Sequence, residues 1–108
     1  RTTTAEKNVV AINGPIWNST KTKTAVENAF YHWEKHGKEF PELLNAKQYV
    51  EYAHEFFKSK NALVKIRPKG EIIRYDLLSN TYGTFTKNGV PKTMFKPKQG
   101  IVYFQTRN

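Results

Sequence analysis

The stretch of the chain richest in side chains that could do chemistry is His32-Trp33-Glu34-Lys35-His36-Gly37-Lys38-Glu39-Phe40. His32 and His36 are four residues apart, so a helix would place both on one face. His36 would end such a helix, where the negative end of the dipole favours a protonated imidazole. A histidine that changes charge near neutral pH is suited to general acid or base catalysis. The alternative is an ordinary surface or packing residue, which is the role we expect for His54.

The residue patterns that other reaction classes require are missing. A His32/His36 metal pair has no third histidine nearby, and Glu34 is out of place for the His-Glu-x-x-His motif of zinc hydrolases. The chain has no cysteine, which excludes disulfides and thiol catalysis. Neither a Gly-x-Ser-x-Gly turn nor a phosphate-binding glycine loop is present. We therefore expect chemistry without a metal or cofactor, with a metal-binding histidine pair as the weaker alternative.

The net charge of +9 is concentrated in the second half of the chain. Residues 1–60 hold nine basic and seven acidic side chains, whereas residues 61–108 hold nine basic side chains and only Glu71 and Asp76. A one-sided excess of this kind attracts polyphosphates. The alternative is a basic surface that only confers solubility. No apolar run approaches the roughly 18–20 residues that span a bilayer, so we expect no membrane partner.

Metal-free chemistry on a polyanion favours RNA as the substrate. A base can take the proton of the ribose 2′-hydroxyl while an acid protonates the leaving 5′-oxygen, and cations and hydroxyls stabilise the phosphorane. DNA lacks the 2′-hydroxyl, so its hydrolysis needs an external water and usually a divalent metal. The shortage of acidic clusters therefore argues for RNA over DNA.

Two helices are expected in the first half of the chain. Thr24 and Glu27 have the spacing of a capping box, and an apolar 3.6-residue period predicts a helix over residues 24–36 that ends at Gly37 in the left-handed region. A second apolar stripe predicts a helix over residues 46–59, capped by Asn45. Residues 1–23 are expected to be a linker or a segment that docks on the core.

After Asn61 the hydrophobic period changes to two, which indicates strands. The expected strands cover residues 64–67, 71–77, 81–86, 90–96 and 101–105. The chain is long enough for one core, so we predict a single α+β domain over residues 24–108. In this domain two N-terminal helices pack on a four- to five-stranded antiparallel sheet.

Asn88-Gly89 predicts a two-residue hairpin turn, which sets the register of the strands on either side. Thr84 then faces Thr93, Tyr82 faces Phe95, and Thr86 faces Pro91. Phe85 and Met94 point together to the other side, where the helices need an apolar surface.

The face that remains half-open mixes hydroxyls with aromatic rings. The residues expected on it are Thr84, Thr93, Tyr82 and Phe95, and the cations expected at its rim are Arg74, Lys92, Lys96 and Lys98. Such a surface can bond phosphate oxygens and stack bases. The alternative is an ordinary solvent-facing ladder of threonines.

Several of these segments together resemble the C-terminal toxin domains of CdiA-type contact-dependent growth inhibition proteins. More widely, they resemble the barnase, EndoU, colicin D and RelE group of ribonucleases. The resemblance covers residues 24–97 and rests on Lys35-His36-Gly37-Lys38-Glu39-Phe40, Asn45–Val50, Tyr75, Asn80–Gly83 and Gly89–Pro97. The first run is similar to Lys-His-Ala-Lys-Asp-Phe of colicin D, and Thr93-Met94-Phe95 is similar to its Ser-x-Trp.

The resemblance implies RNA bound in a cleft between the end of the first helix and the sheet. It implies metal-independent cleavage of tRNA to a 2′,3′-cyclic phosphate, and a cognate immunity protein that blocks the site. Some related toxins also need elongation factor Tu. The domain would be secreted as part of a larger cell-surface protein and delivered into the cytoplasm of target bacteria.

Carried over residue by residue, His36 matches the catalytic histidine, Lys35 a neighbouring cation and Thr93 a hydroxyl on the sheet. Phe95 matches the aromatic residue beside that hydroxyl. A second lysine of colicin D, three residues before its histidine, corresponds to Trp33 here, so its role would fall to Lys35, His32 or Arg74.

The sequence therefore predicts a small tRNA endonuclease toxin. His36 is expected to be the general base or acid, and Thr93 the hydroxyl donor. The other expected participants are the catalytic residues Lys35, Arg74, His32 and Tyr75 and the substrate-binding residues Phe95, Tyr82, Lys92 and Lys96. A non-catalytic RNA-binding module and a toxin nuclease acting on DNA are the alternatives.

Overall fold

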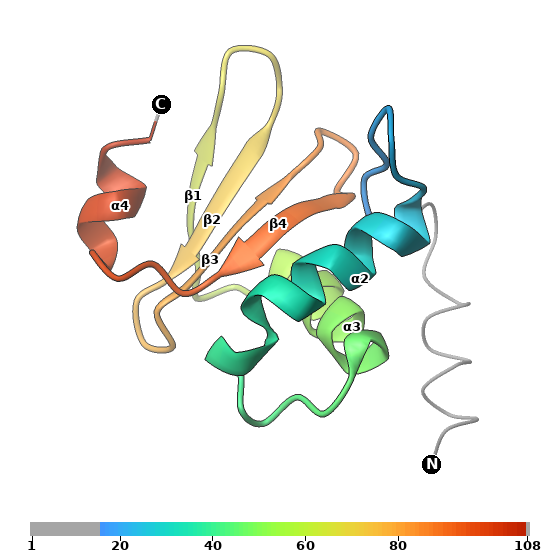
Figure 1. Ribbon diagram of the computed structural model, residues 1–108. Helices are drawn as coiled ribbons and strands as arrows, with labels where there is room; N and C mark the ends of the chain where they lie inside the picture. The colour runs from blue at the N-terminus through green and yellow to red at the C-terminus, as the bar shows by residue number, and fades with distance from the viewer. Residues whose placement is uncertain (1–15, 108) are drawn as a thin grey trace.

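The computed structural model describes residues 16–107, in which helices are followed by an antiparallel sheet and a short last helix (Figure 1). This arrangement confirms the predicted α+β fold. The helical elements are α2 (Ala25–His36), η1 (Gly37–Glu39), α3 (Ala46–Phe57) and α4 (Ile101–Gln105). The strands are β1 (Leu63–Ile66), β2 (Ile72–Asp76), β3 (Thr81–Phe85) and β4 (Pro91–Phe95).

Helix α2 begins with the predicted capping box. The Glu27 amide donates to the Thr24 hydroxyl, and the Thr24 amide donates to the Glu27 carboxylate. The end of the helix differs from the prediction, because Gly37 has φ −57° and lies in the right-handed region. A Cβ on Gly37 would approach the Trp33 ring to 2.6 Å. Glycine is therefore required here for close packing, and the chain continues into the 3₁₀ turn η1.

Helix α3 is also capped as expected, since the Asn45 side chain accepts a hydrogen bond from the Gln48 amide at 2.9 Å. Its apolar stripe supplies the buried residues Tyr49, Val50, Ala53 and Phe56. These side chains meet Phe85 and Met94 of the sheet, which are both fully buried. The predicted inward orientation of Phe85 and Met94 is confirmed.

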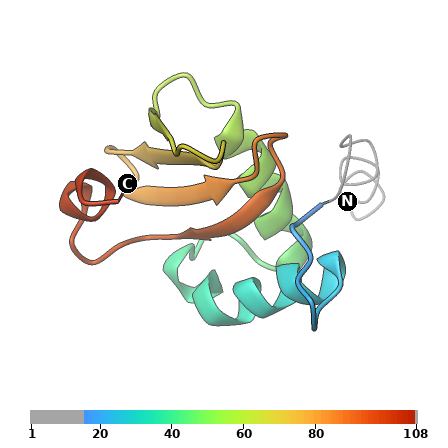
Figure 2. The same cartoon turned by 90° about the horizontal axis from the view of Figure 1, so that it is seen from above.

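The four strands form one antiparallel sheet in the order β1-β2-β3-β4. Helix α3 covers one face of this sheet, α2 lies beside β4, and α4 lies on the opposite face from α3 (Figure 2). Residues of alternate parity along each strand therefore enter two different apolar clusters. We call the face with Thr93 and Phe95, which bears α4, the open face.

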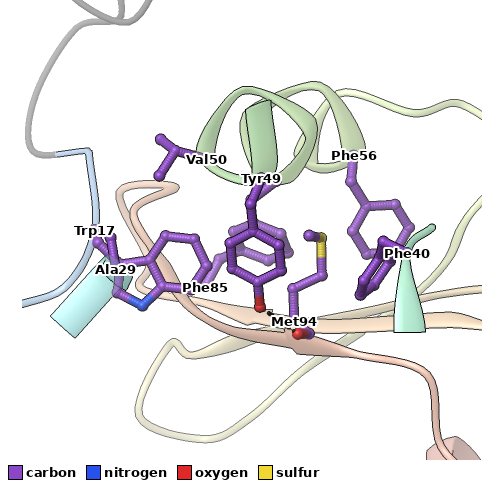
Figure 3. Close-up of a cluster of buried hydrophobic side chains, with 9 residues drawn as sticks. Trp17, Ala29, Phe40, Tyr49, Val50, Phe56, Phe85 and Met94 are labelled. Carbon is purple, nitrogen blue, oxygen red and sulfur yellow. Dashed lines mark hydrogen bonds between the residues drawn. The ribbon is translucent and has the colours of Figure 1, made fainter. Parts of the chain in front are cut away.

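Tyr49 lies at the centre of the larger cluster, and its hydroxyl donates to the Met94 carbonyl at 2.5 Å (Figure 3). Its ring contacts those of Trp17, Trp33 and Phe40, with centroid distances between 5.4 and 5.9 Å. A buried hydroxyl needs a partner because an unpaired one costs about 1–3 kcal/mol. The bond therefore joins α3 to β4 through the middle of the core.

The turn between β3 and β4 differs from the predicted two-residue form. The Thr86 amide donates a hydrogen bond to the Val90 carbonyl, and the Gly89 amide donates to the Thr86 carbonyl. The loop therefore has three residues, and its last residue, Gly89, has φ +89°. Phe85 then faces Pro91, which makes the predicted Thr86–Pro91 pair wrong. A bulge at Lys92 absorbs the extra residue, so Thr84 still faces Thr93 and Tyr82 still faces Phe95.

The predicted last strand is a helix, α4. Five residues are too few for periodicity to separate a buried helix from a strand. Phe104 of α4 packs with Ile73, Tyr75 and Tyr82, so the helix covers part of the face that the sequence left open. Tyr82 and Thr84 are both buried rather than half-open as predicted.

The described residues just before α2 pack on the core. Trp17 is fully buried, its indole donates to the Lys92 carbonyl at 3.1 Å, and the Asn18 amide donates to the Pro91 carbonyl. Residues 1–15 of the expected linker lie outside the described part. Within residues 16–107, no helix has the length and apolar character that crossing a bilayer requires.

We expect Met94→Ala to lower the free energy of unfolding by about 2–5 kcal/mol, because it leaves a cavity beside Tyr49 and Phe85. Urea denaturation measures this change. Leu78→Ala is the control, since Leu78 is 91% exposed and should change stability by less than about 0.5 kcal/mol. Equal stability of the two variants would contradict the position of Met94 in the core.

Candidate functional site

Helix α2 and strand β4 bring together four of the predicted site residues on the open face. His36 stacks on Phe95, with ring centroids 5.3 Å apart and an interplanar angle of 25°. Nδ1 of His32 lies 3.5 Å from the hydroxyl of Thr93. The two histidine rings are themselves stacked at 6.1 Å. Two titratable groups, a hydroxyl and an aromatic ring thus share one small surface.

His36 is oriented by Glu39, three residues further along the chain. Its Nδ1 donates to Oε2 of Glu39 at 2.9 Å, while Oε1 of Glu39 accepts the Lys96 amide at 2.8 Å. The turn η1, made possible by Gly37, places Glu39 next to the end of β4. The carboxylate therefore fixes the imidazole to the sheet and leaves Nε2 as the nitrogen for acid–base chemistry.

His32 is partly buried between two other rings. Its ring packs between Trp17, at a centroid distance of 5.5 Å, and His36. Burial, followed by the positive charges of His36 and Lys35, lowers the pKa of His32 to about 4. At neutral pH this imidazole is uncharged, so it can accept a proton but does not act as a resident cation.

Two tyrosines, the buried Tyr82 and the half-buried Tyr103, continue this series of ring contacts toward α4. The Tyr103 ring meets Tyr82 edge-on at 4.8 Å and Phe95 edge-on at 5.4 Å, and Tyr82 contacts Phe95 at 5.2 Å. Burial, followed by the nearby Tyr103 hydroxyl, raises the pKa of Tyr82 to about 12. We call His32, His36, Phe95, Tyr82 and Tyr103 the aromatic strip, since their rings form one continuous series of contacts.

Three cations lie near the strip. Lys92 donates to Glu71 at 2.8 Å, and Arg67 pairs with the same carboxylate. Although burial alone would raise it, the hydrogen bonds and charges of Lys92 and Arg67 lower the pKa of Glu71 below its ordinary value. Arg107 stacks over Tyr103, with its guanidinium carbon 3.9 Å from the ring centroid.

Several predicted cations lie elsewhere. Arg74 pairs with Gly83 and Val64 on the helix side of the sheet, where it donates to the Ser59 carbonyl and stacks over Phe57. The prediction that it lies at the rim of the open face is therefore wrong. Burial lowers the pKa of Arg74.

Lys96 was predicted to bind substrate on the open face, and Lys35 was predicted as a catalytic cation beside His36. Lys96 donates to the Ser79 carbonyl at 2.8 Å and lies over the Phe40 ring, on the helix side. Lys35 is exposed on α2 and lies over Tyr31. Lys35 is near enough to influence His32 electrostatically. The position of Lys96 follows from the alternation of side chains along a strand. Lys96 comes directly after Phe95, so its side chain points to the opposite face of the sheet.

Tyr75 and His54 make structural contacts. Tyr75 is on the open face but buried under α4, where it stacks on Phe104 and donates to Asn80 at 2.6 Å. Burial, followed by the charge of Asp76, raises its pKa. His54 donates to the Ile16 carbonyl at 3.0 Å, and burial lowers its pKa. The packing role expected for His54 agrees with these contacts.

Sequence reasoning missed four residues of this surface: Glu39, Arg67, Tyr103 and Arg107. The His-x-x-Glu spacing after the helix end was a usable signal for Glu39, because one helical turn brings such positions together. No local sequence pattern identifies Tyr103 and Arg107 as residues of this surface, because their positions depend on the helical form of α4. Within residues 16–107, no three histidine, aspartate or glutamate side chains gather in a way that could hold a metal ion.

The chain matches no protein-family model and no curated protein. The resemblance to CdiA-type toxin domains accordingly stays a prediction.

The lowered pKa of His32 predicts a pH dependence of stability. Between pH 6.5 and about 4 the unfolded chain protonates His32 while the folded protein does not, so stability falls as pH decreases, by up to about 1.4 kcal/mol per pH unit. An NMR titration should give a His32 midpoint near pH 4. The free energy of unfolding of His32→Gln should fall less between pH 7 and pH 5 than that of the wild type. His54→Gln is the control for the other buried histidine. A midpoint near 6.5 would contradict the burial of His32.

Proposed function

We propose that this protein is a metal-independent endoribonuclease toxin domain that cleaves tRNA to a 2′,3′-cyclic phosphate. The observation that carries the proposal is His36, held by Glu39 and stacked on Phe95, beside a neutral His32 and the Thr93 hydroxyl. Two imidazoles in different environments can take the two opposite proton-transfer roles that RNA cleavage needs.

In this proposal His32 is the base and His36 the acid. A neutral His32 accepts the proton of the ribose 2′-hydroxyl, and the 2′-oxygen attacks the adjacent phosphorus. The Glu39 carboxylate stabilises a positive charge on His36, which donates its proton to the leaving 5′-oxygen. The Thr93 hydroxyl donates to the phosphorane oxygen, where charge develops.

The choice of tRNA and the toxin role rest on the resemblance to CdiA-type domains. From the same resemblance we propose an immunity protein as partner and elongation factor Tu as a candidate co-factor protein. We also propose delivery of the domain into the cytoplasm of target bacteria. A non-catalytic RNA-binding module is the second candidate, because the aromatic strip and the neighbouring arginines support binding without catalysis.

One assay separates the candidates. The protein is incubated with total tRNA in EDTA, and the products are tested for 2′,3′-cyclic phosphate ends. A ribonuclease produces them without metal, whereas a binding module retards the tRNA without cutting it. A DNA nuclease leaves tRNA intact and cuts DNA only when a divalent metal is supplied.

His36→Ala should lower tRNA cleavage by about 10²- to 10⁴-fold, because general acid–base catalysis contributes that much. His54→Gln is the matched control, since it removes a histidine that contacts the Ile16 carbonyl and leaves the aromatic strip unchanged. Single-turnover rates at pH 7 compare the two. A folded His36→Ala protein with the wild-type rate would reject the assignment.

Thr93→Val should stay folded and lose about 10-fold or more of the cleavage rate, since it keeps the β-branched shape and removes only the hydroxyl. Thr93→Ser restores a hydroxyl and should recover most of the rate. Thermal melts accompany both measurements. Wild-type activity in Thr93→Val would remove the hydroxyl from the mechanism.

A further inference from the structure

Helix α4 and the residues just after it place an aromatic ring, Tyr103, and a guanidinium, Arg107, at the end of the aromatic strip farthest from His32. The Tyr103 ring contacts Phe95, which stacks on His36, and Arg107 lies flat over Tyr103 at 3.9 Å. Tyr103 and Arg107 are both only half-buried. A stacked guanidinium and ring therefore reach the surface next to the proposed catalytic histidine.

The position of α4 is fixed by Lys65 of β1. Its ammonium group donates to the carbonyls of Phe104, Gln105 and Arg107, at 2.6, 3.0 and 2.9 Å, and lies 4.7 Å from the Phe104 ring centroid. Lysines near a helix C-terminus satisfy its last carbonyls in this way. The backbone that carries Tyr103 and Arg107 is thereby attached to the opposite edge strand of the sheet.

The charges around this end of the strip favour an anion. Arg107 stacks over Tyr103, whose ring meets that of Tyr82. Burial has the larger effect and raises the pKa of Tyr82, whereas the charges of Arg67 and Arg107 both act to lower it. Arg67 and Lys92 share the single carboxylate of Glu71, which leaves one of their two positive charges uncompensated. Arg107 adds a second uncompensated positive charge. A polynucleotide backbone supplies matching negative charges.

We propose that Tyr103 and Arg107 form a subsite for one unpaired nucleobase, next to the phosphate bound between His36 and Thr93. The base stacks on the Arg107–Tyr103 pair, and its backbone phosphate lies beside Arg67 and Lys92. This inference rests on the proposed function and deepens it, because it specifies single-stranded RNA, such as a loop, as the substrate. Bases in a duplex are stacked on one another and cannot enter such a subsite.

The test uses a fluorescein-labelled, single-stranded 2′-O-methyl RNA decamer, which lacks the free 2′-hydroxyl and therefore cannot be cut by the proposed chemistry. Fluorescence anisotropy gives its Kd. Tyr103→Ala and Arg107→Gln should each weaken binding by about 10-fold, the usual size of a lost base-stacking contact. Tyr103→Phe keeps the ring and should bind within about twofold of the wild type. A duplex of the same sequence should bind more weakly and be insensitive to Tyr103→Ala.

Two control variants show whether weaker binding comes from lost stacking or from a change in net charge or in α4. Lys60→Gln removes one exposed positive charge beside Ser59, on the helix side of the sheet, and should leave Kd within about twofold. Val102→Ala shortens a side chain of α4 that is 51% exposed, and should leave both Kd and Tm unchanged. Thermal melts of all variants show whether α4 still packs.

The proposal is overturned if Arg107→Gln binds like Lys60→Gln, and this variant decides the matter where Tyr103→Ala fails to fold. Equal sensitivity of duplex and single strand to Tyr103→Ala also overturns it. Cleavage of tRNA is measured separately. Binding that depends on Tyr103 and Arg107 without tRNA cleavage rejects the ribonuclease and keeps the subsite, whereas cleavage with an unchanged KM in Arg107→Gln rejects the subsite alone.

Discussion

The position of α2 relative to β4 depends on Tyr49, and the candidate site depends on that position. The Tyr49 ring is surrounded by Trp17 from the leading segment, Trp33 from α2 and Phe40 from the chain after α2. Its hydroxyl bonds the Met94 carbonyl, and burial raises its pKa, so it remains a neutral donor. One buried side chain thus sets the separation between the histidines of α2 and the side chains of β4.

His32 and His36 differ in their acid–base properties because they have different neighbours next to this core. His32 packs against Trp17 and loses its proton readily, whereas His36, one turn later, reaches the carboxylate of Glu39. Gly37 makes the second arrangement possible, because a larger residue would collide with Trp33. The end of a single helix therefore combines a neutral imidazole with an imidazole paired to an acid, the asymmetry that general acid–base catalysis uses.

The sheet serves a different purpose on each face. Phe85 and Met94 anchor the core on the side of α3, while the opposite face is divided between α4 and the aromatic strip. The narrow surface that remains between α2 and α4 contains stacked rings with arginines at one end and histidines at the other. The proposed RNA subsite lies on this part of the molecule, because stacked rings next to cations suit single-stranded nucleic acid.

The sequence by itself determined the elements whose signals are local. Thr24 with Glu27 and Asn45 with Gln48 cap their helices because the partners lie within one turn, and alternation sends Thr93 and Met94 to opposite faces. Tertiary structure decided the rest. Residues 101–105 form helix α4 where Phe104 packs on Tyr75 and Lys65 bonds the last carbonyls of the helix. These contacts join residues about 30 to 40 positions apart, so no local pattern encodes them.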